Sequence, residues 1–168
     1  SDTKGAACSA LMSIDTIDND LPLVIANSDQ IFDCELNQIV AEFSKADAGI
    51  PIFESVHPRW SYARTDEGGS VIECSEKNPI SKNAIAGFYY FSKGSTFVRA
   101  AMDSIEKGAE VNGLYYIAPV LNEVVLKGGK IKPYKLNNAE YHTLYTLVHL
   151  NSLQLTLVHH HLLFQAGL

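Results

Sequence analysis

Residues able to hold a metal ion or a phosphate follow a short apolar run near the start of the chain. The run at 23–27 has the length and the β-branched content of a buried strand, and Ser28 and Asp29 come directly after it. In an open α/β sheet, ligands bind just beyond the carboxyl ends of the strands, where a carboxylate can hold a hard cation such as Mg²⁺. Asp is also a preferred helix N-cap, so Asp29 has a second interpretation as a cap, which is the commoner role for an isolated Asp.

Two further stretches carry residue types that occur in binding sites. Glu76 and Lys77 are adjacent and precede an Asn-Pro pair, a pattern that by itself is typical of a solvated turn. Gly87 interrupts an apolar and aromatic run at 84–91, where a glycine often marks the close approach of a ligand or of another backbone, although packing alone can require it. Tyr89, in the same run, is of a type found more often in a core than in a binding site.

The composition is that of a globular domain without a basic surplus. Of the 168 residues, 46% are hydrophobic and 19% are charged, and the formal net charge of −6 argues against broad nucleic-acid binding. Cys8, Cys34 and Cys74 form no disulfide framework and no paired zinc motif, so we expect a reducing, cytoplasmic setting. The sequence has no apolar stretch long enough to span a bilayer, and its first residues lack a signal-peptide pattern.

Hydrophobic periodicity indicates the elements that would position these residues. It predicts helices over 5–18, 35–45, 95–107 and 116–126, and strands over 23–27, 49–56, 60–65, 70–75, 84–91 and 130–136. Strands and helices alternate early and late in the chain, and a hairpin signal lies at 66–69. The pattern therefore predicts an α/β fold with a largely parallel central sheet flanked by helices and an antiparallel section between 50 and 91.

The C-terminal stretch has no clear assignment from its pattern. Residues 144–157 are rich in Leu and Val without a clear period, so strand and helix both remain open. The three consecutive histidines at 159–161 cannot converge on one ion, because neighbouring residues point in different directions. A frayed or artificially added tail explains these histidines more simply than a metal site does.

Five stretches, in order along the chain, resemble motifs of the bacterial sugar-phosphate nucleotidyltransferases, also called nucleoside-diphosphate-sugar pyrophosphorylases. They are a glycine turn before a helix, a strand-end acid motif, a sugar-side segment, a Glu-Lys-Pro-like motif and the strand after it, at 3–7, 25–30, 57–63, 76–81 and 86–91. The likeness is greatest to a branch associated with capsular polysaccharide and lipopolysaccharide synthesis. Each motif is weak alone, but five in the right order are specific.

The resemblance implies a fold, a division of the chain and a reaction. It implies a Rossmann-like nucleotidyltransferase fold with a mixed, mainly parallel sheet over 1–143, as a partial domain, followed by a divergent segment at 144–168 that is helical or disordered. Members of the family couple a nucleoside triphosphate to a sugar 1-phosphate with Mg²⁺ and release pyrophosphate. The expected partners are these two substrates, and a homo-oligomer is compatible with the prediction.

The resemblance also implies a role for each candidate residue. Asp29 would hold Mg²⁺ against the phosphates, and Lys77 would contact the phosphate of the sugar, which suits a compact cation. Glu76 would accept hydrogen bonds from sugar hydroxyls, and Gly5, which has no Cβ, would let the base approach the backbone. The remaining residues that would line the sugar pocket are Ser61, Ile85, Gly87 and Tyr89.

The sequence departs from the family pattern at three places. The strand and Gly-rich loop with which the family begins have no counterpart in the sequence, so we expect an N-terminal truncation relative to the family. Leu114 stands where the family often has a Glu that holds the sugar, and Thr143 stands near the position of a second metal-binding Asp. These departures keep a non-catalytic or truncated domain open as an alternative. A nucleotide-sugar-dependent glycosyltransferase is a lesser alternative, because the motif at 76–79 favours the nucleotidyltransferase.

Overall fold

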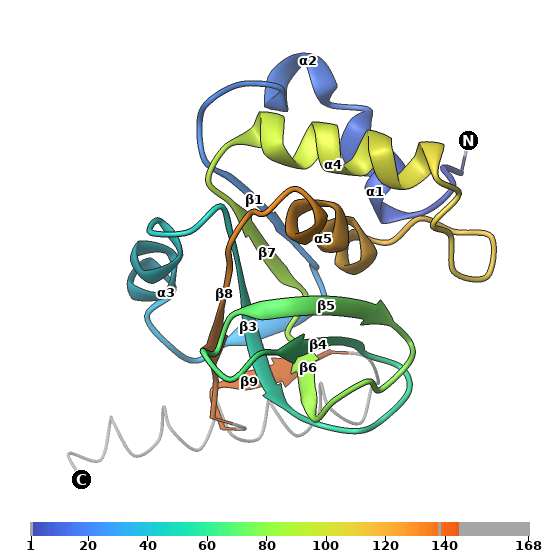
Figure 1. Cartoon of the computed structure of the whole chain (residues 1–168). Helices are drawn as coiled ribbons and strands as arrows, with labels where there is room; N and C mark the ends of the chain where they lie inside the picture. The colour runs from blue at the N-terminus through green and yellow to red at the C-terminus, as the bar shows by residue number, and fades with distance from the viewer. Residues whose placement is uncertain (1, 138, 145–168) are drawn as a thin grey trace, which may run out of the picture.

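The computed structural model describes residues 2–137 and 139–144 of the chain (Figure 1). The helices are α1 (Ala6–Leu11), α2 (Ile14–Ile17), α3 (Leu36–Phe43), α4 (Gly94–Glu106) and α5 (Ile117–Leu126). The strands are β1 (Leu23–Ala26), β2 (Gln30–Phe32), β3 (Ala48–Glu54), β4 (Ser61–Thr65), β5 (Val71–Glu76), β6 (Asn83–Ile85), β7 (Phe88–Phe91), β8 (Ile131–Lys135) and β9 (Tyr141–Thr143).

The main sheet is built around β3, which has neighbours on both of its edges. Along one edge β3 pairs in parallel with β8, and along the other it pairs antiparallel with β7 near its start and with β6 near its end. β6 and β7 follow one another along the same edge of β3, in the same direction, and are separated by Ala86 and Gly87. β1 lies beside β7, and the β4–β5 hairpin lies beside β6. The interruption at 86–87 therefore lies between the β1–β7 pair on one side and β6 with the β4–β5 hairpin on the other.

The α/β class predicted from the sequence is confirmed, but the prediction of a mainly parallel sheet is wrong. Among the described strands, β3 and β8 are the parallel pair, and the other pairings are antiparallel. β1 and β3 do run in the same direction, as the alternation of strands and helices suggests, because both are antiparallel to β7. The strand that separates them comes from much later in the sequence, and a local pattern cannot reveal it.

Helices cover both faces of the sheet, which explains the unbroken apolar sequence of β7. Figure 1 shows α4 and α5 side by side on one face and α3 on the other. Tyr89 and Phe91 belong to the core cluster beneath α4 and α5, whereas Phe88 and Tyr90 belong to the cluster beneath α3. A strand that is buried on both faces has apolar residues at every position rather than at alternate ones.

Two predicted elements differ from those observed, and one pair of strands was not predicted. The helix expected over 5–18 is two short helices, α1 and α2, and the strand expected over 84–91 is divided at Gly87. The missed pair is β2 with β9, which is antiparallel and joins Gln30 to Thr143. The predictions for 145–168, including the histidines, lie outside the described residues. No helix in the described part of the chain is long and apolar enough to cross a bilayer.

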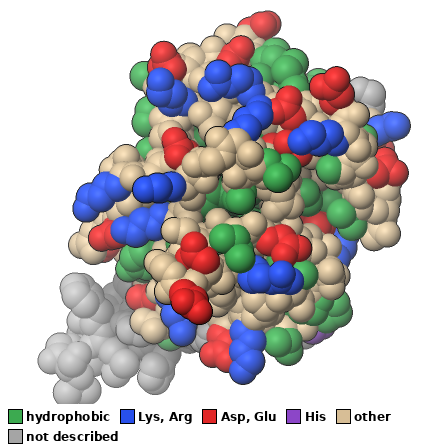
Figure 2. Space-filling model, in the orientation of Figure 1, with side chains coloured by type: hydrophobic (Ala, Val, Ile, Leu, Met, Phe, Trp, Pro, Cys, Tyr) green, Lys and Arg blue, Asp and Glu red, His purple; other side chains and the backbone are tan. Residues whose placement is uncertain are grey.

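The visible surface carries charges of both signs. Figure 2 shows basic and acidic side chains interspersed over one face of the molecule. Among the described residues, Arg64 pairs with Glu73 at 2.9 Å across the β4–β5 hairpin, and Lys93 pairs with Asp20 at 2.9 Å. Exposed pairs of this kind contribute little to stability.

Candidate functional site

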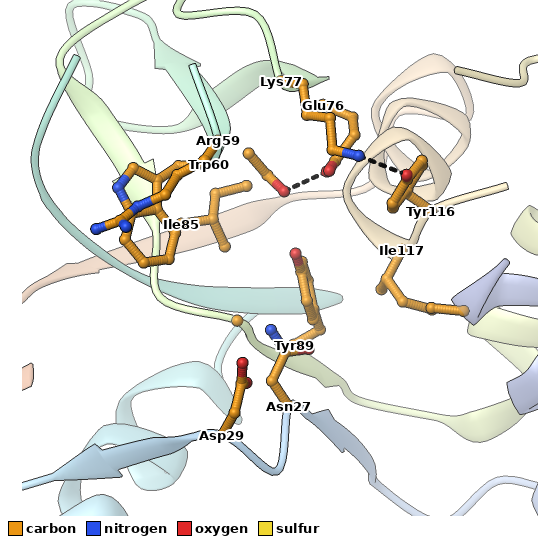
Figure 3. Close-up of a pocket in the computed structure, with 13 residues that line it drawn as sticks. Asn27, Asp29, Arg59, Trp60, Glu76, Lys77, Ile85, Tyr89, Tyr116 and Ile117 are labelled. Atoms are coloured by element: carbon orange, nitrogen blue, oxygen red, sulfur yellow. Dashed lines mark hydrogen bonds between the residues drawn. The ribbon is translucent and has the colours of Figure 1, made fainter. Parts of the chain in front are cut away.

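A pocket of about 410 Å³ lies where the sheet divides between β1 and the β4–β5 hairpin (Figure 3). The ends of β1 and β5, the start of β4, the break before β7 and the start of α5 all contribute to its wall. The residues that line it are Ala6, Asn27, Asp29, Arg59, Trp60, Ser61, Glu76, Lys77, Ile85, Gly87, Tyr89, Tyr116 and Ile117.

Seven of the eight residues that the sequence resemblance singles out line this one pocket, although they come from separate parts of the chain. The exception is Gly5, whose neighbour Ala6 lines the pocket instead. A Cβ on Gly5, which has φ +101°, would lie 2.4 Å from the carbonyl oxygen of Tyr115. Gly5 therefore permits the close packing of the chain start against the start of α5. The roles of the eight residues stay predictions.

Gly87 shapes the floor of the pocket at the break in the strand. Its φ is +57°, and a Cβ there would lie 2.6 Å from Nδ2 of Asn27 and 2.7 Å from Oε1 of Gln30. The carbonyl of Gly87 accepts hydrogen bonds from the backbone N–H of Asn27 and from Nε2 of Gln30, each at 2.9 Å. Only a glycine combines this conformation with such a close approach of β1. The end of β1 is thereby held against the pocket.

Asp29 lies directly beyond β1, and its side chain is directed into the pocket (Figure 3). The residues that follow it form β2 rather than a helix, and α3 begins only at Leu36. The interpretation of Asp29 as a helix cap is therefore wrong. Burial raises the pKa of the Tyr141 hydroxyl, and the negative charge of Asp29 raises it further. The Asp29 side chain itself is exposed, so its carboxylate is accessible to a ligand.

Glu76 ends β5 as a buried carboxylate with a hydroxyl partner. Ser61 lies opposite it in the β4–β5 pair, and the Ser61 hydroxyl donates a hydrogen bond to Oε2 of Glu76. Burial raises the pKa of Glu76, and the hydrogen bond from Ser61 and the charge of Lys77 oppose part of that rise. Burial likewise raises the pKa of the Tyr89 hydroxyl. This side of the pocket thus offers buried polar groups, which suit a neutral ligand rich in hydroxyls.

Lys77 brings a positive charge to the same wall from an unusual backbone conformation. Its φ is +55°, a value that a residue with a side chain rarely adopts, and its N–H donates to the carbonyl of Trp60 at 3.0 Å. The ammonium donates a hydrogen bond to the hydroxyl of Tyr116 at 2.7 Å and lies 4.7 Å from the centre of that ring. The Lys77 charge therefore lies between the sheet and α5.

Arg59 and Trp60 form the rim next to β4. The Arg59 guanidinium lies 4.5 Å from the centre of the Trp60 ring, and Trp60 packs edge-on against Phe53 at 5.3 Å. The hydroxyl of Tyr62 donates to the carbonyl of His57 at 2.7 Å and so holds the loop that carries both residues. A second cation therefore faces a pocket that also contains Asp29.

Sequence reasoning assigned no binding role to four polar or aromatic residues of this pocket: Asn27, Arg59, Tyr116 and Trp60, the last of which it interpreted as a core or rim aromatic. Asn27 directly precedes Ser28 and Asp29, and Arg59 and Trp60 lie within the motif at 57–63, so a signal existed for these three. Tyr116 has no local signal, because its place is set by the packing of α5 against β5.

The pocket fits Mg²⁺ only if a ligand supplies most of the coordination. The described residues contain no group of three His, Cys, Asp or Glu side chains that could hold a metal ion. Glu76 is buried whereas Asp29 is exposed, so Asp29 is the carboxylate of the pocket that is better placed to bind a hydrated cation. Mg²⁺ keeps several waters and is commonly bound by one or two carboxylates together with substrate phosphates. Asp29 meets that requirement when a phosphate is bound beside it.

The two substituted family positions differ in their distance from the pocket. Leu114 lies in a turn, bridged to Val111, and does not line the pocket. Thr143 pairs with Gln30 in the β2–β9 ladder, and the N–H of Leu144 donates to the carbonyl of Asp29 at 2.8 Å. Thr143 is therefore close to Asp29 in the backbone pairing, although it does not line the pocket.

Two solved structures that share this architecture have been described as enzymes that act on nucleotide sugars or sugar phosphates. A nucleoside-diphosphate-sugar pyrophosphorylase from Vibrio cholerae RC9 matches 90% of the chain with a TM-score of 0.74 at 23% identity. A Bacillus anthracis protein assigned as a glucose-1-phosphate thymidylyltransferase, in complex with sucrose, matches 90% of it with a TM-score of 0.67 at 24% identity. The chain has the sugar nucleotidyltransferase fold.

The match to this fold is structural and partial. The chain spans 65% and 61% of the lengths of the two proteins, which is less than two thirds of each. No protein-family model matches the sequence, and a search of curated proteins gave no significant match. The sugar nucleotidyltransferase fold agrees with the resemblance seen in the sequence motifs, and at this identity it bears on the fold and not on the substrate.

Proposed function

We propose that the pocket binds a sugar 1-phosphate and that the protein transfers a nucleotidyl group to it from a nucleoside triphosphate. The observation that carries the proposal is the convergence of Asp29, Glu76 and Lys77 on one pocket at the break in the sheet. A strand-end carboxylate, a buried carboxylate with a hydroxyl partner and an ammonium are suited to a metal-bound phosphate, a sugar hydroxyl and a phosphate, respectively.

The reaction needs positioning and charge neutralisation more than covalent help from the protein. An oxygen of the sugar 1-phosphate attacks the α-phosphorus of the triphosphate, the bond to the β-phosphate oxygen breaks, and pyrophosphate leaves. Lys77 holds the attacking phosphate and offsets its charge, while Glu76 and Ser61 orient the sugar through its hydroxyls. Asp29 would hold Mg²⁺, which supplies positive charge to the phosphate oxygens when it is bound.

The same proposal includes a cellular role. The product would be a nucleotide-activated sugar for surface polysaccharide synthesis, capsular polysaccharide or lipopolysaccharide, made in the cytoplasm with Mg²⁺. The sequence motifs at 25–30, 57–63 and 76–81 support this role, since their likeness is greatest to that branch. The base and the sugar are left to experiment.

A non-catalytic sugar-phosphate-binding domain is the second candidate, and Thr143 is the observation that favours it. A Thr near Asp29 leaves one carboxylate where two would hold the metal more firmly. We expect turnover to be slow for the same reason. Loss of a single preorganised group that stabilises an anionic transition state costs about a hundred- to a thousandfold in rate.

The test is pyrophosphate release from the common nucleoside triphosphates with a panel of sugar 1-phosphates and Mg²⁺. We expect release that requires both substrates and that falls by about a hundredfold in Asp29→Ala and in Lys77→Ala. Glu67→Ala, in the exposed β4–β5 turn, is the matched control for loss of a charge and should keep the wild-type rate. Thr143→Asp should raise the Mg²⁺-dependent rate.

The outcomes separate the two candidates. If neither the chain nor Thr143→Asp releases pyrophosphate with any pair of substrates, while a sugar 1-phosphate still binds, these 168 residues form a sugar-phosphate-binding domain that does not turn over by itself. Release that is unchanged in Asp29→Ala would remove Asp29 from the mechanism and contradict the proposed metal site.

A further inference from the structure

The start of α5 approaches the pocket through a short chain of backbone contacts. The N–H of Tyr115 donates to the carbonyl of Lys4 at 2.8 Å, and the carbonyl of Tyr115 accepts from the N–H of Ala7 at 3.0 Å. The absence of a side chain at Gly5 allows this approach. Both the N–H and the carbonyl of Tyr115 are therefore hydrogen-bonded to the first residues of the chain. The next residue, Tyr116, lines the pocket.

Tyr116 contacts the Lys77 ammonium in two ways. Its hydroxyl oxygen accepts a hydrogen bond from Nζ at 2.7 Å, and its ring centre lies 4.7 Å from the same atom (Figure 3). Both interactions are stronger with a charged lysine than with a neutral partner. A lysine side chain has much rotational freedom, so two contacts on its charged end restrict where that charge can lie.

The backbone of Lys77 supports a fixed position for its side chain. Two residues other than glycine have positive φ in the described chain: Asn112, which precedes Gly113 in a turn, and Lys77. Asn often adopts this conformation, whereas Lys rarely does. Backbone strain of this kind persists where the surrounding structure enforces it, and it is concentrated at binding and catalytic sites. The N–H of Lys77 is held by the carbonyl of Trp60 at 3.0 Å.

We propose that Tyr116 is a positioning residue for Lys77, fixing the ammonium at the pocket wall before an anionic ligand arrives. This inference rests on the proposed function only in taking Lys77 as the group that contacts phosphate. An ammonium has three protons, so the bond to Tyr116 does not by itself prevent Lys77 from binding a phosphate oxygen. The loss of freedom on binding is then smaller, because Tyr116 has already ordered the side chain.

The experiment compares Tyr116→Phe with Tyr115→Phe. The first removes the hydroxyl and keeps the ring over Lys77. The second removes the neighbouring hydroxyl, for which the described residues provide no hydrogen-bond partner, and serves as the matched control. Lysines labelled with ¹³C at Cε, which leaves the ammonium unmodified, are observed by NMR, with the Lys77 signal assigned from Lys77→Arg. Inorganic phosphate and α-D-glucose 1-phosphate are the probes, and thermal melting verifies that both variants are folded.

We expect the Lys77 Cε signal to shift in Tyr116→Phe and to stay in place in Tyr115→Phe. Binding of the phosphate probes should weaken by up to about tenfold in Tyr116→Phe alone, the cost of ordering one long side chain on binding. With substrates that turn over, the same variant should lower kcat/KM for the sugar phosphate without changing the melting temperature.

Other results would overturn the inference. An unmoved Lys77 signal in Tyr116→Phe would show that the hydroxyl does not hold the ammonium, and equal weakening in both variants would show a general effect of aromatic substitution. Binding of the probes that is unchanged in Tyr116→Phe would also contradict it. Failure of the proposed function is distinct, since it would appear as absent pyrophosphate release while the Lys77 signal and phosphate binding still depend on Tyr116.

Discussion

Ser61 and Glu76 face each other across the β4–β5 pair, and the Ser61 hydroxyl donates a hydrogen bond to the Glu76 carboxylate. The pairing places a titratable group in a buried wall of the pocket with a partner that supplies one proton. An ionised carboxylate loses hydration when it is buried, and one hydroxyl replaces only part of it. The pair therefore couples the stability of the hairpin to pH.

Glu76→Gln should make the protein less sensitive to pH. Because burial raises the pKa of Glu76 in the folded state, the folded protein holds this proton more firmly than the unfolded chain does. The stability of the wild type should then fall, relative to Glu76→Gln, as the pH rises from below the ordinary carboxyl range through the raised pKa of the folded state. Urea denaturation across that range measures the difference. Glu67→Gln controls for loss of a charge, and a difference between wild type and Glu76→Gln that does not vary with pH would contradict the assignment.

Gly87→Ala should destabilise the protein by about 1–3 kcal/mol and weaken ligand binding. The new Cβ would have both a positive φ and contacts near 2.6–2.7 Å with the side chains of Asn27 and Gln30. Gly108→Ala is a matched control, because Gly108 has φ +65° but no atom near its Cβ position. The loss in the free energy of unfolding of Gly108→Ala measures the cost of the positive φ, and any larger loss in Gly87→Ala measures the steric clash with β1. Equal losses of stability in the two variants would show that the close approach of β1 is unimportant.

Lys77→Gly should be more stable than Lys77→Ala by about 1 kcal/mol, although both lose the ammonium. Glycine adopts the positive φ of Lys77 without the steric cost that alanine incurs. The two variants should bind phosphate equally poorly, so binding and stability are separated at a single position. Chemical denaturation measures the difference in stability. If the alanine variant is as stable as the glycine variant, position 77 does not have the left-handed conformation.

The elements with strong local patterns were predictable from the sequence, whereas the expectation that Asp29, Glu76 and Lys77 share a cleft came from the strand-end rule and the family resemblance. The strand before Asp29 and the helix α4 have periodicities that depend only on nearby residues. The β2–β9 pair was not predictable, because it depends on a partner far along the chain; Gln30 and Tyr141 are 111 residues apart. That pair decides against the cap interpretation of Asp29, so the sequence alone had to leave both interpretations open.

The direction and order of the strands were likewise beyond local patterns. The sequence predicts that β1 and β3 lie in one sheet but does not show that β7 separates them. Tyr116 was missed for a related reason. Its contact with Lys77 spans 39 residues and joins a helix to the end of a strand, and such contacts leave no periodic trace in the sequence.

The central claim is that one pocket, at the break between β6 and β7, binds a sugar through its 1-phosphate. The most direct test is a ¹⁵N NMR titration with each member of a panel of sugar 1-phosphates, with the corresponding free sugars as controls. At least one sugar 1-phosphate should shift the amide signals of Asn27, Lys77 and Gly87 while leaving Gly108 unchanged. The free sugar should bind more weakly, and Lys77→Gly should abolish the preference for the phosphorylated form. If no sugar 1-phosphate shifts these signals, or if the shifted residues lie away from the pocket, the claim is wrong.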